Sequence, residues 1–150
     1  MNNAVLISIN PKWCKLIASG EKSIEVRKTR PKISAPFKCY IYCTNTKDTE
    51  HPDWLGKVIG EFTCDWCEQY MPCRTDFAEL SAGSLVEPKE LYEYANGKPL
   101  YGWHITDLKI YDKAKPLSDL SRWVDQGMWT RLIKLSRPPQ SWMRVERRTL

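Results

Sequence analysis

Short apolar runs, several of them rich in β-branched or aromatic residues, recur along this chain and predict a strand-rich protein. The strongest runs predict five strands, at Ala4–Ile9, Phe37–Thr44, Lys57–Asp65, Leu100–Asp112 and Ser141–Glu146. The segment "SIEVRK", which starts at Ser23, alternates instead: Ile24 and Val26 point one way, and Glu25 and Arg27 point the other. We expect a further strand here, with one apolar face and one charged face.

Helical patterns are confined to segments between the strands. The clearest follows the first strand, where Asn10 suits the N-cap, Pro11 the first helical position and Gly20 the C-terminal stop. Three other segments are expected to hold helices, at Pro88–Gly97, Asp76–Leu80 and Leu117–Val124. Strands therefore dominate, and the chain is predicted to form an α+β domain built on a small, mostly antiparallel barrel.

Length and composition narrow the class of protein. The 150 residues fit a single domain, residues 1–150, and the net charge of +5 suits a polyanionic partner. Seven Trp and seven Tyr exceed what packing alone requires, so some rings are expected to serve recognition. No apolar run approaches the roughly 18 residues of a membrane span, and no secretory leader is recognisable, so a cytoplasmic protein is expected.

The cysteines raise the question of a zinc site. Cys64 and Cys67 form a CxxC pair, Cys73 follows, and His51 lies upstream. Structural zinc sites usually combine two ligand pairs, and only one clean pair is present here. We therefore expect these cysteines to pack as small apolar residues rather than to act as ligands, and we expect the protein to bind no metal and no cofactor. No P-loop, GxGxxG, HExxH or GxSxG motif occurs, which leaves ATPase, dinucleotide-binding and zinc-protease functions without support.

One sequence motif points to a particular protein family more specifically than these patterns do. The run "GEKSIEVR", Gly20–Arg27, matches G-x-K-x-x-E-x-R at every specified position. Together with "GWHITDLKIYD" and "RPPQSW" further along the chain, it resembles the ASCH domain, a branch of the PUA-like superfamily, in its small stand-alone bacterial and phage form. The resemblance extends from Ala4 to about Glu146. It implies an α+β, PUA-like pseudo-β-barrel, mostly antiparallel, with two or three helices packed around it.

The resemblance also implies a function. ASCH relatives are associated with RNA binding, RNA processing or nucleoside chemistry, and the motif lines a cleft beside the first helix. Charge alternation alone favours an exposed, charged strand face, and only with the family motif added is the cleft favoured. The expected partner is single-stranded RNA or a nucleotide, bound in a basic cleft. The residues expected to bind it are Lys22, Glu25, Arg27, Lys28, Arg30, Trp13, Tyr42 and Trp142.

Two alternatives stay open. One is a hydrolase, either a ribonuclease or an enzyme similar to the relatives that remove the acyl group from N4-acetylcytidine with a Lys, a Thr three residues later and a distant Glu. Here Lys22 fills the Lys position, Glu25 replaces the Thr, and Glu90 or Glu93 could supply the acid. Glu25 would then act as general base on water and Lys22 as electrostatic stabiliser. The other alternative is a phage-encoded module that meets a host protein.

Overall fold

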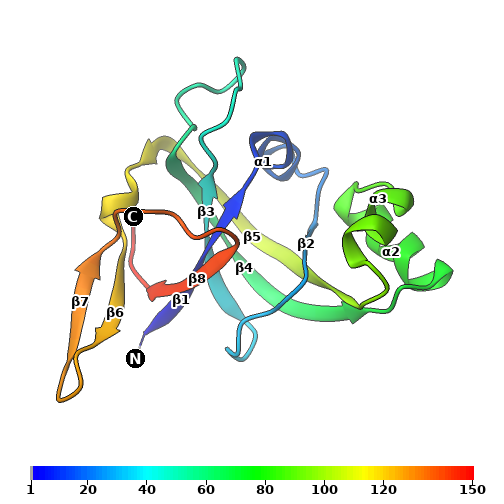
Figure 1. The fold of residues 1–150 in the computed structure, drawn as a ribbon. Helices are drawn as coiled ribbons and strands as arrows, with labels where there is room; N and C mark the ends of the chain where they lie inside the picture. The colour runs from blue at the N-terminus through cyan, green and yellow to red at the C-terminus, as the bar shows by residue number, and fades with distance from the viewer. Residues whose placement is uncertain (1) are drawn as a thin grey trace.

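A computed structural model describes residues 2–150 of the chain (Figure 1). The elements in order are β1 (Asn3–Ile9), α1 (Pro11–Ala18), β2 (Ile24–Arg27), β3 (Phe37–Cys43), β4 (Lys57–Tyr70), α2 (Arg74–Ser84), α3 (Pro88–Ala95), β5 (Leu100–Lys115), the 3₁₀ turn η1 (Leu117–Asp119), β6 (Ser121–Asp125), β7 (Thr130–Lys134) and β8 (Trp142–Glu146). Within residues 2–150, every helix is too short or too polar to cross a bilayer.

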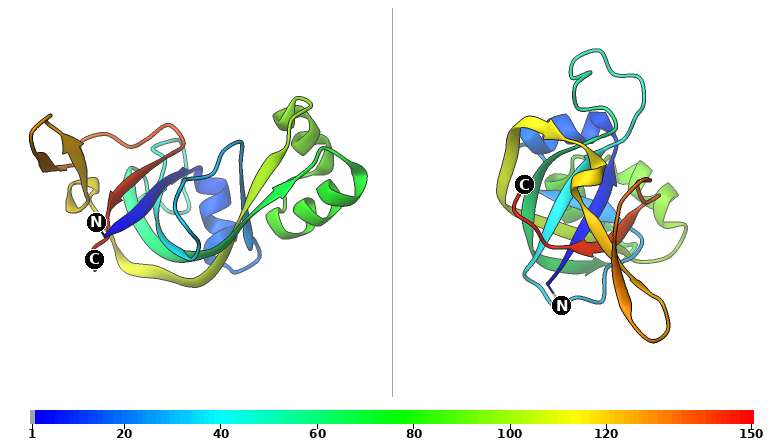
Figure 2. Two further views of the ribbon diagram at one scale, coloured as in Figure 1. Left: turned by 90° about the horizontal axis from the view of Figure 1, so that it is seen from below. Right: turned by 90° about the vertical axis from the view of Figure 1, so that its left-hand side faces the viewer.

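Six strands form one curled sheet in the order β2-β5-β4-β3-β1-β8, and β6 and β7 form a separate hairpin. Only β1 and β3 pair in parallel; the other neighbours are antiparallel. The sheet curls around α1 into an open barrel, as Figure 2 shows. The expectation of an α+β, mostly antiparallel pseudo-barrel with surrounding helices is confirmed.

Both faces of the sheet are covered, which explains why "AVLISI" is continuously apolar rather than alternating. Val5, Ile7 and Ile9 on β1 pack with Cys14 and Ile17 of α1. The opposite face of β1 packs against the chain around η1 and β8. A third cluster joins the two helices α2 and α3 to β2 and the ends of β4 and β5. A strand buried on both faces loses the period-2 signal, since neither face is exposed to water.

The two edges of the sheet, β2 and β8, approach each other without a backbone ladder between them in residues 2–150. Side chains bridge this gap. Trp142 Nε1 donates to Thr29 Oγ1 at 3.0 Å, and Arg144 Nη2 donates to the carbonyl of Lys32 at 2.8 Å. The buried Trp103, on the neighbouring β5, donates from Nε1 to the carbonyl of Thr29 at 3.2 Å. The segment after β2 is therefore tied to β8 by side chains alone.

Some boundaries differ from the prediction. β4 continues to Tyr70 rather than ending at Asp65, because its last residues pair with the start of β5 across a bulge between Cys64 and Cys67. The helix expected at Asp76–Leu80 is longer, and its start beside Asp76 is fixed by the bond from the amide of Met71 to that carboxylate at 2.8 Å.

The expected helix at Leu117–Val124 is wrong beyond its first turn. Only η1 is helical, and Ser121–Asp125 is a strand that pairs with β7. A tight turn reverses the chain between β6 and β7. Asp125 accepts a hydrogen bond from the amide of Gly127 at 2.7 Å, and Gly127 has a φ of 87°. Glycine adopts this left-handed conformation without steric cost, so "DQG" was the turn signal that the helical interpretation passed over.

A tight contact behind β2 gives a test of the packing. A Cβ on Gly102 would lie 2.6 Å from Cε2 of Tyr70 and 2.9 Å from Cγ2 of Ile24. We predict that Gly102→Ala lowers the free energy of unfolding by about 1–3 kcal/mol through overpacking, measured by urea denaturation. In a Tyr70→Ala background part of this loss should vanish, because the ring is removed. An undiminished loss there would contradict the contact.

Candidate functional site

A cavity of about 350 Å³ opens between the start of α1, β2 and α3. This volume falls within the range of about 300–1,000 Å³ that small-molecule pockets occupy. Polar, charged and aromatic side chains share its wall with a few apolar ones. The lining residues are Ser8, Asn10, Trp13, Glu25, Val26, Arg27, Val86, Glu90, Leu91 and Tyr94.

Local sequence explains how β1, α1 and β2 bring their residues here. The side chain of Asn10 caps α1 by accepting a hydrogen bond from the amide of Lys12 at 3.0 Å, which fixes the helix start beside β1. Gly20, with a φ of 83°, turns the chain towards β2. Ile24 of β2 then packs into the cluster beneath α2, so Glu25 and Arg27 are presented on the other face.

Arg27 binds across the gap in the barrel. Its Nη2 donates to the carbonyl oxygen of Ser8 at 2.6 Å and to Glu25 Oε2 at 3.3 Å. Its Nη1 donates to Ser141 Oγ at 3.1 Å. Ser8 belongs to β1 and Ser141 directly precedes β8, so this one guanidinium joins β2 to the far side of the sheet. Both of its terminal nitrogens are thereby occupied within the protein.

Lys22 is fully buried behind the cavity. Its Nζ donates to the carbonyl of Ser84 at 2.6 Å, lies 3.7 Å from Glu25 Oε1 and sits 4.5 Å from the centre of the Trp13 ring. Burial lowers the pKa of Lys22 from its ordinary value, the nearby Glu25 opposes this shift, and Arg27 adds to it. Lys22 therefore has no direct access to a ligand; it acts on the cavity through Glu25 and Trp13.

The aromatic walls carry the exposed positive charge. The ammonium of Lys12 lies 4.6 Å from the centre of the Trp13 ring, and that of Lys28 lies 4.6 Å from the centre of the Tyr94 ring. Burial raises the pKa of Tyr94, so its hydroxyl stays protonated at neutral pH. The cavity thus combines carboxylates inside, flat rings on its walls and lysines at its rim.

The structure brings together four of the residues singled out in the sequence, namely Lys22, Glu25, Arg27 and Trp13, and places Lys28 at the rim. The others lie elsewhere. Arg30 lines a separate depression with Tyr101, and Lys28 lines that depression too. Tyr42 points to the opposite face of β3, in the cluster that contains Tyr111. Trp142 bonds to Thr29 in the gap between β2 and β8.

Sequence reasoning missed the contribution of Tyr94 and treated Glu90 only as a possible distant acid. Both face the cavity because Leu91, on the same helix, is buried against β2 and fixes the rotation of α3. The i, i+4 spacing of Glu90 and Tyr94 puts them on one helix face. Lys12 was also missed; its place one residue after Pro11 was the available signal.

The residues weighed for zinc are dispersed. Cys64 and Cys67 are buried with their sulfur atoms 3.5 Å apart, whereas Cys73 is exposed and His51 stacks on Trp54. Among residues 2–150, no three His, Cys, Asp or Glu side chains are grouped so that they could hold a metal ion. His104 of β5 is half-buried, and its Nε2 lies 3.1 Å from the hydroxyl of Tyr70.

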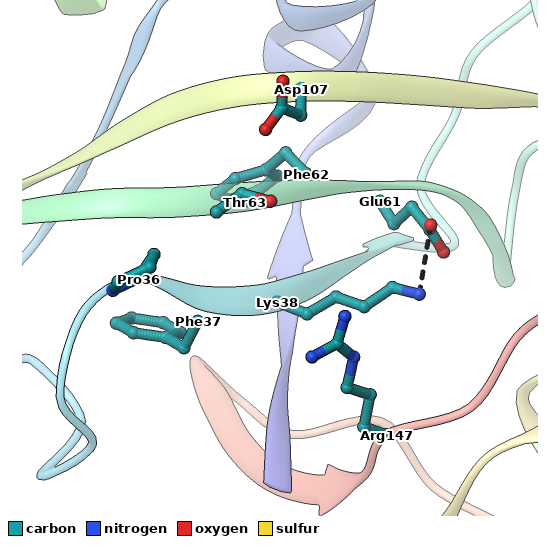
Figure 3. Close-up of a pocket in the computed structure, with 8 residues that line it drawn as sticks. All are labelled: Pro36, Phe37, Lys38, Glu61, Phe62, Thr63, Asp107 and Arg147. Atoms are coloured by element: carbon teal, nitrogen blue, oxygen red, sulfur yellow. Dashed lines mark ion pairs between the residues drawn. The ribbon is translucent and has the colours of Figure 1, made fainter.

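A second cavity, of about 310 Å³, lies over β3, β4 and the chain end (Figure 3). Lys38 and Glu61 pair across it at 3.1 Å, and Glu61 also accepts a hydrogen bond from the hydroxyl of Tyr111 at 2.6 Å. Figure 3 shows the guanidinium of Arg147 beside Lys38. Arg147 and Asp107 also line this cavity, and neither makes an ion pair within residues 2–150. The cavity between α1 and α3 is the stronger candidate because it is lined by the motif residues Glu25 and Arg27.

Neither a family model nor a curated protein matches this sequence. Among solved structures, the chain is similar to ASCH from Zymomonas mobilis, with 20% identity over 93% of this chain and 85% of that one and a TM-score of 0.64. A Ser→Ala variant of that protein matches at 19% identity, with 93% and 86% covered and a TM-score of 0.64. A Tyr→Phe variant matches at 19%, with 93% and 88% covered and a TM-score of 0.63.

The chain has the ASCH fold. The matches cover nearly all of the chain, and the fold predicted from "GEKSIEVR" and its companion words is confirmed. In this ASCH fold, the motif residues Lys22, Glu25 and Arg27 meet at the gap between β2 and β1, where the cavity opens.

The buried Lys22 predicts a pH dependence of stability. Because its pKa is lowered on folding, the unfolded chain binds more protons just below the ordinary lysine pKa, and stability rises with pH in that window. We expect the unfolding free energy of the wild type, relative to Lys22→Met, to increase from about pH 7 to about pH 10. Urea denaturation across this range measures it. A constant difference would contradict a desolvated lysine, since the groups shared by both proteins cancel.

Proposed function

We propose that the cavity between α1, β2 and α3, from here on called the cleft, binds one nucleotide, free or within single-stranded RNA. The observation that carries the proposal is the meeting of two aromatic rings, Trp13 and Tyr94, with a buried carboxylate, Glu25, and with a lysine over each ring. Proteins bind unpaired bases by stacking them on aromatic rings and bonding their edges, and lysines meet the phosphates. The ASCH fold is in keeping with this function but does not by itself assign it.

The polar groups favour particular bases. Glu25 accepts hydrogen bonds from the amide of Val26 and from Arg27, and a carboxylate has about four acceptor positions. Glu90 makes no ion pair within the described residues 2–150. Free carboxylate positions accept hydrogen bonds from exocyclic amino groups, as they do from the N4 amino group of cytosine. We therefore expect the bases with an exocyclic amino group, namely cytosine, adenine and guanine, to bind better than uracil, with the phosphate beside Lys12 and Lys28.

The test is the affinity for cytidine, adenosine and uridine monophosphates by titration calorimetry. Trp13→Ala and Tyr94→Ala should each weaken binding by about 1–3 kcal/mol, roughly 5- to 150-fold, through lost stacking. Tyr92→Ala is the matched control, because Tyr92 is equally exposed on the same helix but packs on Phe77. Equal affinities for the wild type and Tyr94→Ala, with both folded, would refute the proposal.

A second candidate is a hydrolase that uses the same cleft. One observation favours it: Glu25 and Arg27 line the cavity side by side, and Lys22 lies buried behind Glu25, an arrangement that suits a general base acting on water. The Thr used by the N4-acetylcytidine branch is replaced by Glu25, so any acyl removal would need a water molecule as nucleophile.

Cleavage separates the two functions. End-labelled single-stranded RNA is incubated with the wild type, Glu25→Gln and Lys22→Met, and one gel shows both retardation and cutting. Binding alone predicts retardation without products. Products formed by the wild type and reduced at least about 100-fold in Glu25→Gln, the lower range of general-base effects, would favour the enzyme. Acetate release from N4-acetylcytidine, followed in parallel, tests the amidohydrolase form.

A further inference from the structure

The β6–β7 hairpin, residues 121–134, projects from the body as an arm (Figures 1 and 2). Only its base is anchored: Leu120 and Leu135 lie in the core, and the amide of Leu135 donates to the carbonyl of Leu120 at 2.9 Å. Beyond this base, β6 packs along β8. The arm's length is therefore not needed to complete the hydrophobic core.

The arm nevertheless carries large apolar side chains in water. Met128 is 93% exposed and Trp129 is 64% exposed at its tip, and Trp123 and Leu132 are exposed and directly opposite each other on its strands. None of these four belongs to a core cluster of the described residues. Such a concentration of exposed apolar surface on one element marks a contact site for a partner.

The charges on the arm indicate the kind of partner. Arg122, Arg131 and Lys134 are exposed, and none makes an ion pair within residues 2–150. The single carboxylate, Asp125, accepts the turn hydrogen bond from Gly127. A second copy of the arm would bring like charges together in a symmetric contact. A polyanion with flat apolar faces, such as single-stranded nucleic acid, complements both the lysine and arginine charges and the indole rings.

The arm is also continuous with the cleft. Ser141, bonded to Arg27 at the cleft, directly precedes β8, and β8 runs from there to the side on which β6 packs. Five strand residues at about 3.3 Å each span roughly 13–17 Å. β8 is an edge strand, and its Arg144 is exposed. A strand of RNA leaving the cleft along β8 would thus pass Arg144 and then meet the arm.

From this arrangement we propose that the arm is a second contact for single-stranded RNA, with Trp129 and Trp123 stacking on bases and Arg122, Arg131 and Lys134 meeting phosphates. This inference rests on the proposed function of the cleft and extends it from one nucleotide to a longer strand. On this proposal the arm supplies the additional affinity for longer RNA strands, and the cleft selects the base.

The experiment compares a monophosphate with a single-stranded RNA of about 12 nucleotides, within the site sizes of small single-strand-binding folds. The proteins are the full chain, Trp129→Ala and the double variant Arg122→Gln with Arg131→Gln. Controls are Trp66→Ala, which removes an equally exposed indole from β4, and Lys47→Gln, which removes a charge from a remote loop.

We expect Trp129→Ala to bind the oligomer about tenfold more weakly and the monophosphate unchanged. The double variant should lower the slope of log affinity against log salt by about 0.7 for each lost phosphate contact. Both controls should match the wild type.

Oligomer binding that is equal in wild type and arm variants overturns the inference and leaves the cleft intact. If oligomer binding depends on the arm but the monophosphate does not bind, the arm's role as an RNA contact is supported and nucleotide binding by the cleft is refuted. Loss of self-association in Trp129→Ala by light scattering, or loss of binding to anionic lipid vesicles alone, would overturn the RNA assignment in favour of a second copy or a membrane surface.

Discussion

The guanidinium of Arg27 is the interaction on which this barrel depends. The two edges of its sheet, β2 and β8, are not joined by a backbone ladder in the described chain, and Arg27 spans the gap by bonding β2 to Ser8 on β1 and to Ser141 before β8. A planar group with five donors in fixed directions suits this role better than a lysine would. Side chains thus bridge the gap in this open barrel, and the bridged gap leaves room for a cavity beside α1.

Burying this guanidinium requires compensation, and Glu25 provides it. Glu25 lies between Arg27 and the fully buried Lys22, so one carboxylate is shared by two cations. Removal of one partner from a buried charge pair leaves an uncompensated charge and is strongly destabilising, by about 3–5 kcal/mol. The bond from Lys22 to Ser84 and its position over Trp13 relieve part of the excess positive charge. The charged residues of β2 therefore stabilise the fold as well as line the cavity.

The sequence predicted this region well because its signals are local. The cap at Asn10, the turn at Gly20 and the strand β2 are each determined by neighbouring residues, and each is present as expected. The end of β4 could not be predicted from local signals, since its last residues form a strand only through their pairing with β5. Tyr94 was missed for a related reason: its place in the cavity depends on how α3 packs, which no local pattern encodes.

The division of labour in the cleft follows from these bonds. Because both terminal nitrogens of Arg27 and the ammonium of Lys22 are engaged within the protein, the motif leaves mainly Glu25 to face a ligand. The remaining contacts come from α1 and α3, elements outside the G-x-K-x-x-E-x-R word. A match to this motif therefore predicts how the barrel closes more strongly than what it binds. Under the proposed function, the side chains of Trp13, Glu90 and Tyr94, which line the cavity, select the ligand.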